Sequence, residues 1–223
     1  MYTAARLNSA TPSCGWPGPN ARSTSRSASA QWRSAAASSP ANRRLRHRPS
    51  CARASALSNL GTDEEHVGDH ASAAAHFHRA LQLQLGELEP NHPDILFTLV
   101  GLADVAIAAH DPATAQAHAL RAVALGETSL GKTHPLLVHP LEQLARLAVS
   151  RGDQPAAVAL LERAAALPEL LPVARGYIHF ELAQALWAEG RDRRRARAMA
   201  EASLTELTDK ETAEVTSWLR SHR

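Results

Sequence analysis

The sequence is short of aromatic residues, cysteines and long hydrophobic runs, and each shortage excludes a class of protein. Only 4% of the 223 residues are aromatic, whereas 44% are hydrophobic, with alanine and leucine prominent among them. Strands favour aromatic and β-branched side chains, so this composition favours packed helices. The two cysteines, Cys14 and Cys51, are too few for a disulfide framework, and neither has a second ligand at metal-site spacing.

No stretch of the sequence is long and apolar enough to cross a membrane, which requires about 18 consecutive apolar residues. The N-terminus also lacks the short apolar core of a secretory signal. We therefore expect a cytoplasmic protein that contacts no membrane.

Acidic residues are absent from the N-terminal part of the chain. Residues 1–53 contain nine arginines and no Asp or Glu, whereas residues 54–223 carry 15 basic and 22 acidic side chains, a net charge of −7. The overall charge of +2 therefore hides a cationic tail and an anionic body. Nucleic acid is not an expected partner of an anionic body.

Residues 1–50 have the composition of a disordered segment. They are rich in Ser, Ala, Pro and Arg and show no apolar period. Such a segment cannot bury enough apolar surface to offset a chain entropy of ~1–2 kcal/mol per residue. The interpretation that we favour is a linker, left where a longer protein was cut or its start misassigned. An organellar transit peptide and an anion-binding patch at residues 43–48 are the alternatives.

From residue 52 onward the sequence repeats itself with a period of 42 residues. Leu57, Leu60 and Gly61 recur as Leu99, Leu102 and Ala103, and the His-Pro pair at 92–93 recurs at 134–135. A third copy and a degenerate fourth copy follow. Their matching positions are Leu141, Leu144, Ala145, Gly152, Ala157 and Ala164, and then Leu182, Ala183, Leu186, Gly190 and Ala196.

Each repeat has the pattern of two antiparallel helices. Apolar and small residues follow the i, i+3, i+4, i+7 spacing of one helix face, and a turn at Gly68-Asp69 or its counterparts interrupts it. Asp is a good N-cap, and Pro112 stands where a first helical turn accepts proline. A single hairpin cannot bury its apolar face, so we expect three or more to stack into a superhelix with a concave side.

These Leu, Leu-Gly, Ala, Phe and Ala positions resemble the tetratricopeptide repeat, in its kinesin-light-chain form. The resemblance implies an all-α solenoid of about three and a half to four helix-turn-helix repeats, preceded by the disordered tail. We place the repeat domain at residues 51–221, with repeats near 52–92, 93–134, 135–171 and 172–208. A capping helix at 210–221 would carry Val215, Trp218 and Leu219 on one face.

The C-terminal stretch from Phe180 resembles the end of the repeat regions that follow the catalytic domain of myxobacterial serine/threonine protein kinases. The 22 arginines against two lysines fit a GC-rich bacterial genome. The sequence has no glycine-rich phosphate loop, His-Arg-Asp loop or Asp-Phe-Gly motif, so we expect no enzyme, no cofactor and no metal. The predicted function is a protein-binding scaffold, and the alternative is the detached regulatory or docking region of such a kinase.

In the resembled family the first helix of each repeat lines a concave, peptide-binding groove. The register implies a groove that runs from a polar to an aromatic end. Its expected residues are Ser58, Thr62, Glu65, Phe97, Val100, Asp104, Ile107, His139, Glu142, Arg146, Tyr177, Phe180, Gln184 and Trp187. The alternative for Phe180 and Trp187 is that they pack between helices. Ser58 and Thr62 stand where relatives that clamp a C-terminal carboxylate have Lys and Asn, so an acidic-tail ligand is not expected.

Two further clusters have a structural and a functional interpretation each. The histidines at 66, 70, 76 and 78 are dense enough to suggest zinc, but the predicted turn at Gly68-Asp69 separates the first two, and we expect solvated side chains. Residues 191–197 hold five arginines that could bind phosphate. Glu189 and Glu201 are spaced to pair with them, so we expect a solvated helix face.

Overall fold

The computed structural model describes residues 49–222, and this part of the chain is helical and contains no strand. Its nine α-helices are α3 (Pro49–Val67), α4 (His70–Glu87), α5 (Pro93–Ala108), α6 (Pro112–Leu130), α7 (Val138–Ser150), α8 (Gln154–Ala165), α9 (Pro172–Glu189), α10 (Arg193–Ser203) and α11 (Asp209–Ser221). The expected disorder of the N-terminal tail concerns residues that lie almost wholly outside the described range.

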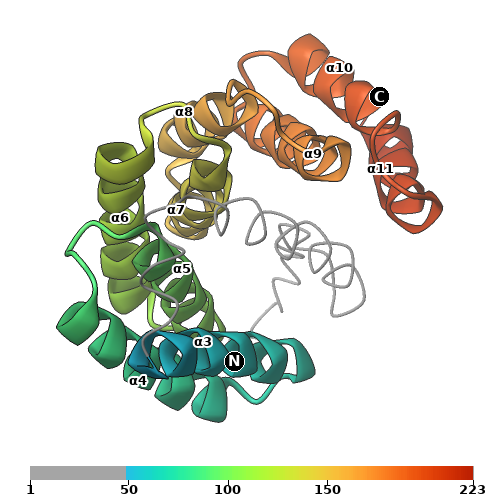
Figure 1. Cartoon of the computed structure of the whole chain (residues 1–223). Helices are drawn as coiled ribbons and strands as arrows, with labels where there is room; N and C mark the ends of the chain where they lie inside the picture. The colour runs from blue at the N-terminus through green and yellow to red at the C-terminus, as the bar shows by residue number, and fades with distance from the viewer. Residues whose placement is uncertain (1–48, 223) are drawn as a thin grey trace, which may run out of the picture.

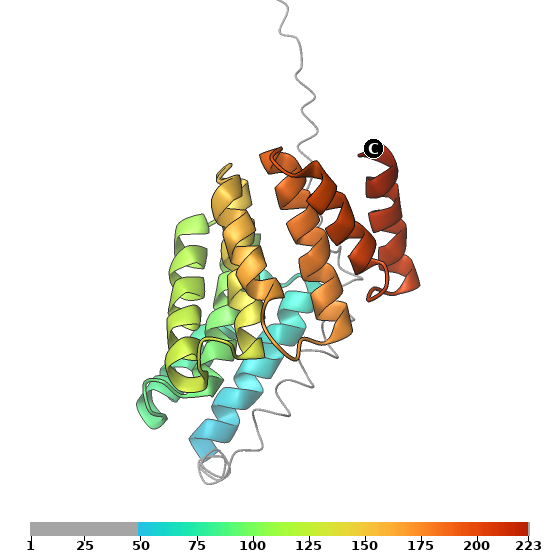
Figure 2. The same cartoon turned by 90° about the horizontal axis from the view of Figure 1, so that it is seen from above.

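Consecutive helices pair as hairpins, and the hairpins stack into an arc (Figure 1). The partners are α3 with α4, α5 with α6, α7 with α8, and α9 with α10. The first helix of each pair lies on the inner side of the arc and the second on the outer side. Figure 2 shows the pairs side by side, with α11 beyond α9 and α10 at the end of the stack. The predicted all-α solenoid is confirmed.

The turn inside each hairpin has a residue with positive φ, and an aspartate follows it directly in three turns and after Arg191 in the fourth. Gly68, Gly152 and Gly190 have φ of +88°, +77° and +78°. The aspartate after each turn caps the next helix, accepting a hydrogen bond from a backbone N–H three residues on, over 2.8–3.2 Å. These N-caps satisfy backbone N–H donors that have no partner inside the helix. They start the second helix of each pair directly after the break that the sequence predicted.

The loops between hairpins use histidine in a role that the sequence did not predict. His92 Nδ1 accepts a hydrogen bond from the Asp94 N–H, and His134 Nδ1 accepts one from the Leu136 N–H, both over 3.2 Å. The proline that follows each histidine opens a helical turn. After His134 this turn is the 3-10 helix η1 (Pro135–Leu137), from which α7 continues.

Small residues set the distance between neighbouring helices. Alanines at the helix crossings are fully buried, and their absent side-chain bulk lets the helix axes approach. Gly101 in α5 has the same effect on the buried ring of Phe77 in α4, because a Cβ at residue 101 would lie 2.4 Å from the Phe77 Cζ atom. The two largest clusters of buried residues each extend across a boundary between hairpins, one from α4 to α6 and the other from α5 to α10.

Helix α11 closes the C-terminal end of the stack. Val215 is fully buried and packs with Phe180, Ala183 and Ala200, while Trp218 and Leu219 pack on the same cluster. Thr208 and Glu211 form a reciprocal capping box at its N-terminus. The apolar face predicted for a capping helix is thus the face that contacts α9 and α10.

Candidate functional site

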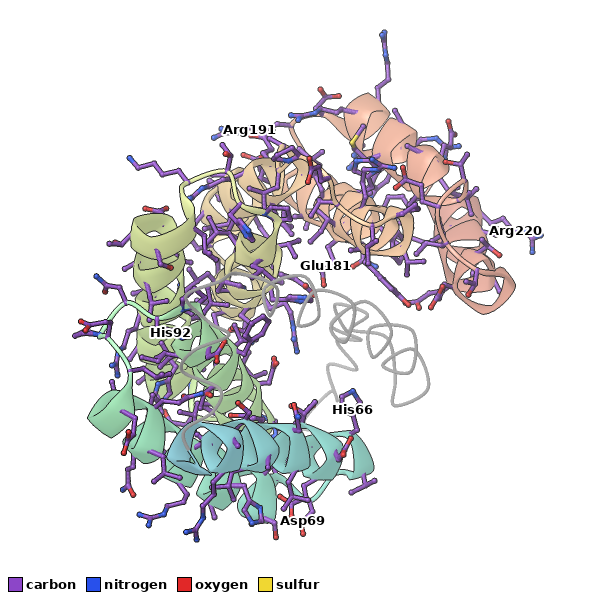
Figure 3. All side chains as sticks on the ribbon, in the orientation of Figure 1. His66, Asp69, His92, Glu181, Arg191 and Arg220 are labelled. Carbon is purple, nitrogen blue, oxygen red and sulfur yellow. The ribbon has the colours of Figure 1, made fainter. Side chains whose placement is uncertain are left out.

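The candidate site is the concave face formed by α3, α5, α7 and α9. Figure 3 shows the side chains of Glu181 and His66 directed toward the space inside the arc, whereas Asp69 points away from it. A helix face turned inward in this way brings residues from hairpins that are far apart in the sequence to one surface.

At the α3 end, the expected polar residues are engaged in the fold itself. Ser58 is 8% exposed, and its hydroxyl is 2.9 Å from the hydroxyl of Thr98 in α5. Thr62 Oγ1 donates a 2.9 Å hydrogen bond to the Ser58 carbonyl oxygen. The contact with Thr98 joins α3 to α5, and the low exposure of Ser58 leaves it little surface for a ligand.

The middle of the concave face, on α5 and α7, combines apolar and charged side chains. Phe97, Val100, Asp104 and Ile107 are all partly exposed on α5. On α7, His139 and Arg146 are partly exposed, and Glu142 is 9% exposed. The structure thus brings the expected residues of the second and third repeats together on adjacent helices.

Sequence reasoning missed two residues of this region, Gln143 and Glu181. Gln143 is 3% exposed, and its Nε2 donates a 2.9 Å hydrogen bond to the Val100 carbonyl oxygen. Glu181 lies on α9, partly buried, in the register position of Gln143. The signal was a polar residue at this position in two successive repeats, but the resemblance did not assign that position to the groove.

The carboxyl groups of this region lie in an environment that disfavours their charge. Burial raises the pKa of Asp104, and the charge of Glu65 adds to this, whereas Arg146, Gln143 and His139 oppose it. Burial and the nearby Glu181 raise the pKa of Glu142 well above its usual range.

Glu181 itself also titrates above its usual range. Burial raises its pKa to about 7, although Arg146 acts in the opposite direction. Three carboxyl groups from three inner helices, those of Asp104, Glu142 and Glu181, therefore lie near one arginine, and they hold protons at a higher pH than ordinary carboxyls do.

The aromatic residues expected at the C-terminal end pack against α11. Phe180 is 5% exposed, and Trp218 meets it edge-on at 6.0 Å between ring centroids. Trp187 packs edge-on against Trp218 at 5.7 Å, and the Arg193 guanidinium lies 4.9 Å above its ring. Tyr177 donates a hydrogen bond to the Glu211 carboxylate.

These aromatic side chains owe their positions to helix packing, because each of them contacts a residue of α11. Gln184, the remaining expected residue of the fourth repeat, is partly exposed. Ligand contact by these four residues of α9 stays a prediction.

The other clusters singled out in the sequence form contacts within the fold. His76 Nδ1 is 2.6 Å from Glu64 Oε2, an interaction that joins α4 to α3. Arg191 pairs with Glu189 over 3.3 Å, and Arg197 with Glu201 over 3.5 Å, as their spacing predicted. Among residues 49–222 no group of three or more potential ligands is placed to hold a metal ion.

Within the same described range, no helix has both the length and the apolar character that a membrane crossing requires.

The fold and this concave face define a class of protein, the helical-repeat solenoids that serve as interaction scaffolds. The tetratricopeptide-repeat family model matches residues 52–128 and 98–169. The chain belongs to the tetratricopeptide-repeat family, whose members are generally non-catalytic scaffolds that mediate contacts between proteins. No curated protein matches the chain significantly.

Solved structures with the same fold include BtubC (BKLC) from P. vanneervenii, with a TM-score of 0.64 and 16% identity. That match covers 91% of this chain and 78% of the other. A putative kinesin light chain with nearly identical TPR-like repeats from Podosopora anserina matches with a TM-score of 0.61 and 23% identity, over 79% of this chain and 96% of the other. At these identities the likeness concerns the fold alone.

Proposed function

We propose that this protein is a non-catalytic cytoplasmic scaffold whose concave face binds an extended segment or helix of a partner protein. The observation that carries the proposal is the middle of that face. There Phe97, Val100 and Ile107 keep part of their apolar surface exposed beside Asp104 and Glu142. Apolar anchors flanked by polar groups are what a peptide-binding surface needs for affinity and for orientation.

Site-specific photo-cross-linking in cells that express the full chain tests this proposal. A benzoylphenylalanine residue in place of Phe97 reports on the concave face. The same residue in place of Leu120 reports on the outer helix α6, where Leu120 is 50% exposed. We expect a cross-linked partner from position 97 and none from position 120. Cross-links that form only from position 120 would move the binding surface to the outer helices and refute the proposal.

The kinase-linked alternative rests on the C-terminal resemblance and on the arginine-rich composition. A scaffold that acts beside a serine/threonine kinase would use the same concave face to hold the kinase or its substrate. Identification of the protein cross-linked at position 97 distinguishes a general scaffold from a kinase-linked one. A kinase or a kinase substrate among the cross-linked products favours the kinase-linked function.

A further inference from the structure

The concave face carries more negative than positive charge at the junction of α5, α7 and α9. The titratable groups that face this junction are Glu65 from α3, Asp104 from α5, His139, Glu142 and Arg146 from α7, and Glu181 from α9. One arginine thus stands among four carboxyl groups. When these carboxyls are ionised, the junction keeps an excess of negative charge.

Two oxygen atoms at the same junction have no hydrogen-bond donor. Gln143 Oε1 and Glu181 Oε2 are buried and make no hydrogen bond. Gln143 is 3% exposed, and its Nε2 atom is hydrogen-bonded to the Val100 carbonyl oxygen of α5. A buried acceptor without a donor is unfavourable, because it has lost its hydrogen bonds to water and gained none in return. A ligand that supplies N–H groups here would remove this penalty.

We propose that Asp104, Glu142, Gln143 and Glu181 form a binding site for an arginine side chain carried by the segment of a partner protein that docks on the concave face. The proposal rests on the proposed function and names the chemistry of its ligand. A guanidinium group matches the site because its five N–H donors form a planar fork that serves two carboxylates and an amide oxygen at once. A lysine ammonium carries three donors and no fork, and it is more strongly hydrated.

The raised carboxyl pKa values mean that the charge of Arg146 does not offset the burial of these groups. A guanidinium brought beside Glu142 and Glu181 favours their ionised forms, so binding must release protons below neutral pH. We therefore expect the ligand to bind more tightly at pH 8 than at pH 5, where the two carboxyls hold more protons.

The probe is a fluorescein-labelled polyalanine peptide that carries two arginines, titrated with the full chain at pH 8 and followed by anisotropy. The reference is the same peptide with citrulline, which keeps the shape of arginine and removes its charge. Glu142→Gln/Glu181→Gln removes two site carboxylates. Glu89→Gln/Glu201→Gln removes two exposed carboxylates away from the concave face and is the charge-matched control. Circular dichroism verifies that both variants fold.

We expect the arginine peptide to bind at least about tenfold more tightly than the citrulline peptide, because only the arginine side chain donates charge-assisted hydrogen bonds. The Glu142→Gln/Glu181→Gln variant should lose about tenfold in affinity. The Glu89→Gln/Glu201→Gln variant should lose less than twofold. Equal losses in the two variants would mean general attraction between a cation and an acidic protein, and they would overturn the site.

The arginines of the chain's own N-terminal segment are a competing source of the same group. A full-length variant with glutamine at Arg43, Arg44, Arg46 and Arg48 should bind the probe within about twofold of the natural sequence. A gain of tenfold or more would make that segment the resident ligand and overturn the assignment to a partner.

A partner that is cross-linked at position 97 with the same yield in the Glu142→Gln/Glu181→Gln variant refutes the arginine site only. The absence of any partner at Phe97 refutes the concave binding surface.

Discussion

The hairpin turns show how a single backbone angle limits sequence choice. Three of the four turns place glycine at positive φ, where a side chain is strained. The turn between α5 and α6 has His110 at this position, with φ of +58°. The His110 side chain is exposed, so no packing contact compensates for the strain of its backbone. His110 is therefore a site where the present sequence is less stable than it needs to be.

We predict that His110→Gly raises the free energy of unfolding by about 0.5–1 kcal/mol. Relief of left-handed strain gives about 1–2 kcal/mol, and the greater entropy of glycine in the unfolded chain removes part of it. Urea denaturation of the full chain measures the change as a higher midpoint. Gly152→Ala, the opposite exchange at the same turn position, should lower the midpoint. A lower midpoint for His110→Gly would show that the histidine makes a stabilising contact in the turn.

At the scale of elements, the approach of α4 to α5 depends on a residue without a side chain. The Phe77 ring is 2% exposed and lies against Gly101. We predict that Gly101→Ala destabilises the protein by about 1–3 kcal/mol, the usual effect of an inserted methyl group in a packed core. The gain in helix propensity, about 0.5–1 kcal/mol, is smaller than this steric term.

Gly86 in α4 provides the matched control for Gly101. It is also helical, but it is exposed, and a Cβ atom added there would meet no neighbour within 4 Å. Gly86→Ala should therefore stabilise the protein by about 0.5–1 kcal/mol. Thermal unfolding of both variants, followed by circular dichroism, gives the two changes. A Gly101→Ala variant as stable as Gly86→Ala would mean that α4 and α5 separate without loss.

The helices were predictable because their start and stop signals are local. Asp69 and Pro112 act within one turn of their own position, so the sequence alone places them at helix ends. The role of α9 was not predictable in the same way. Phe180 and Trp187 face α11, and that contact depends on how a later helix docks. Glu181 was not predicted as a site residue because the charged group that acts on it lies on α7, a helix of the preceding repeat.

At the scale of the whole molecule, the carboxyl groups of the concave face connect the stability of the stack to pH. Glu181 has a pKa of about 7 against 4.5 for an ordinary glutamate, and Glu142 is raised as well. Between these pH values the folded chain holds protons that the unfolded chain has released. The unfolded state then binds fewer protons, so the free energy of unfolding falls as pH rises through this window.

We predict that the protein is less stable at pH 8 than at pH 5, by on the order of 2 kcal/mol from these carboxyls. Other groups titrate in the same range. Burial lowers the pKa of His118 and of His134, and these two histidines change stability in the opposite direction. The Glu142→Gln/Glu181→Gln variant isolates the carboxyls, because glutamine keeps the shape of glutamate and does not titrate. Urea midpoints at the two pH values should fall less in this variant than in the natural sequence. Equal falls in both proteins would show that the two carboxyls are ionised in the folded state at pH 5, and that α7 and α9 pack without the strain of buried charge.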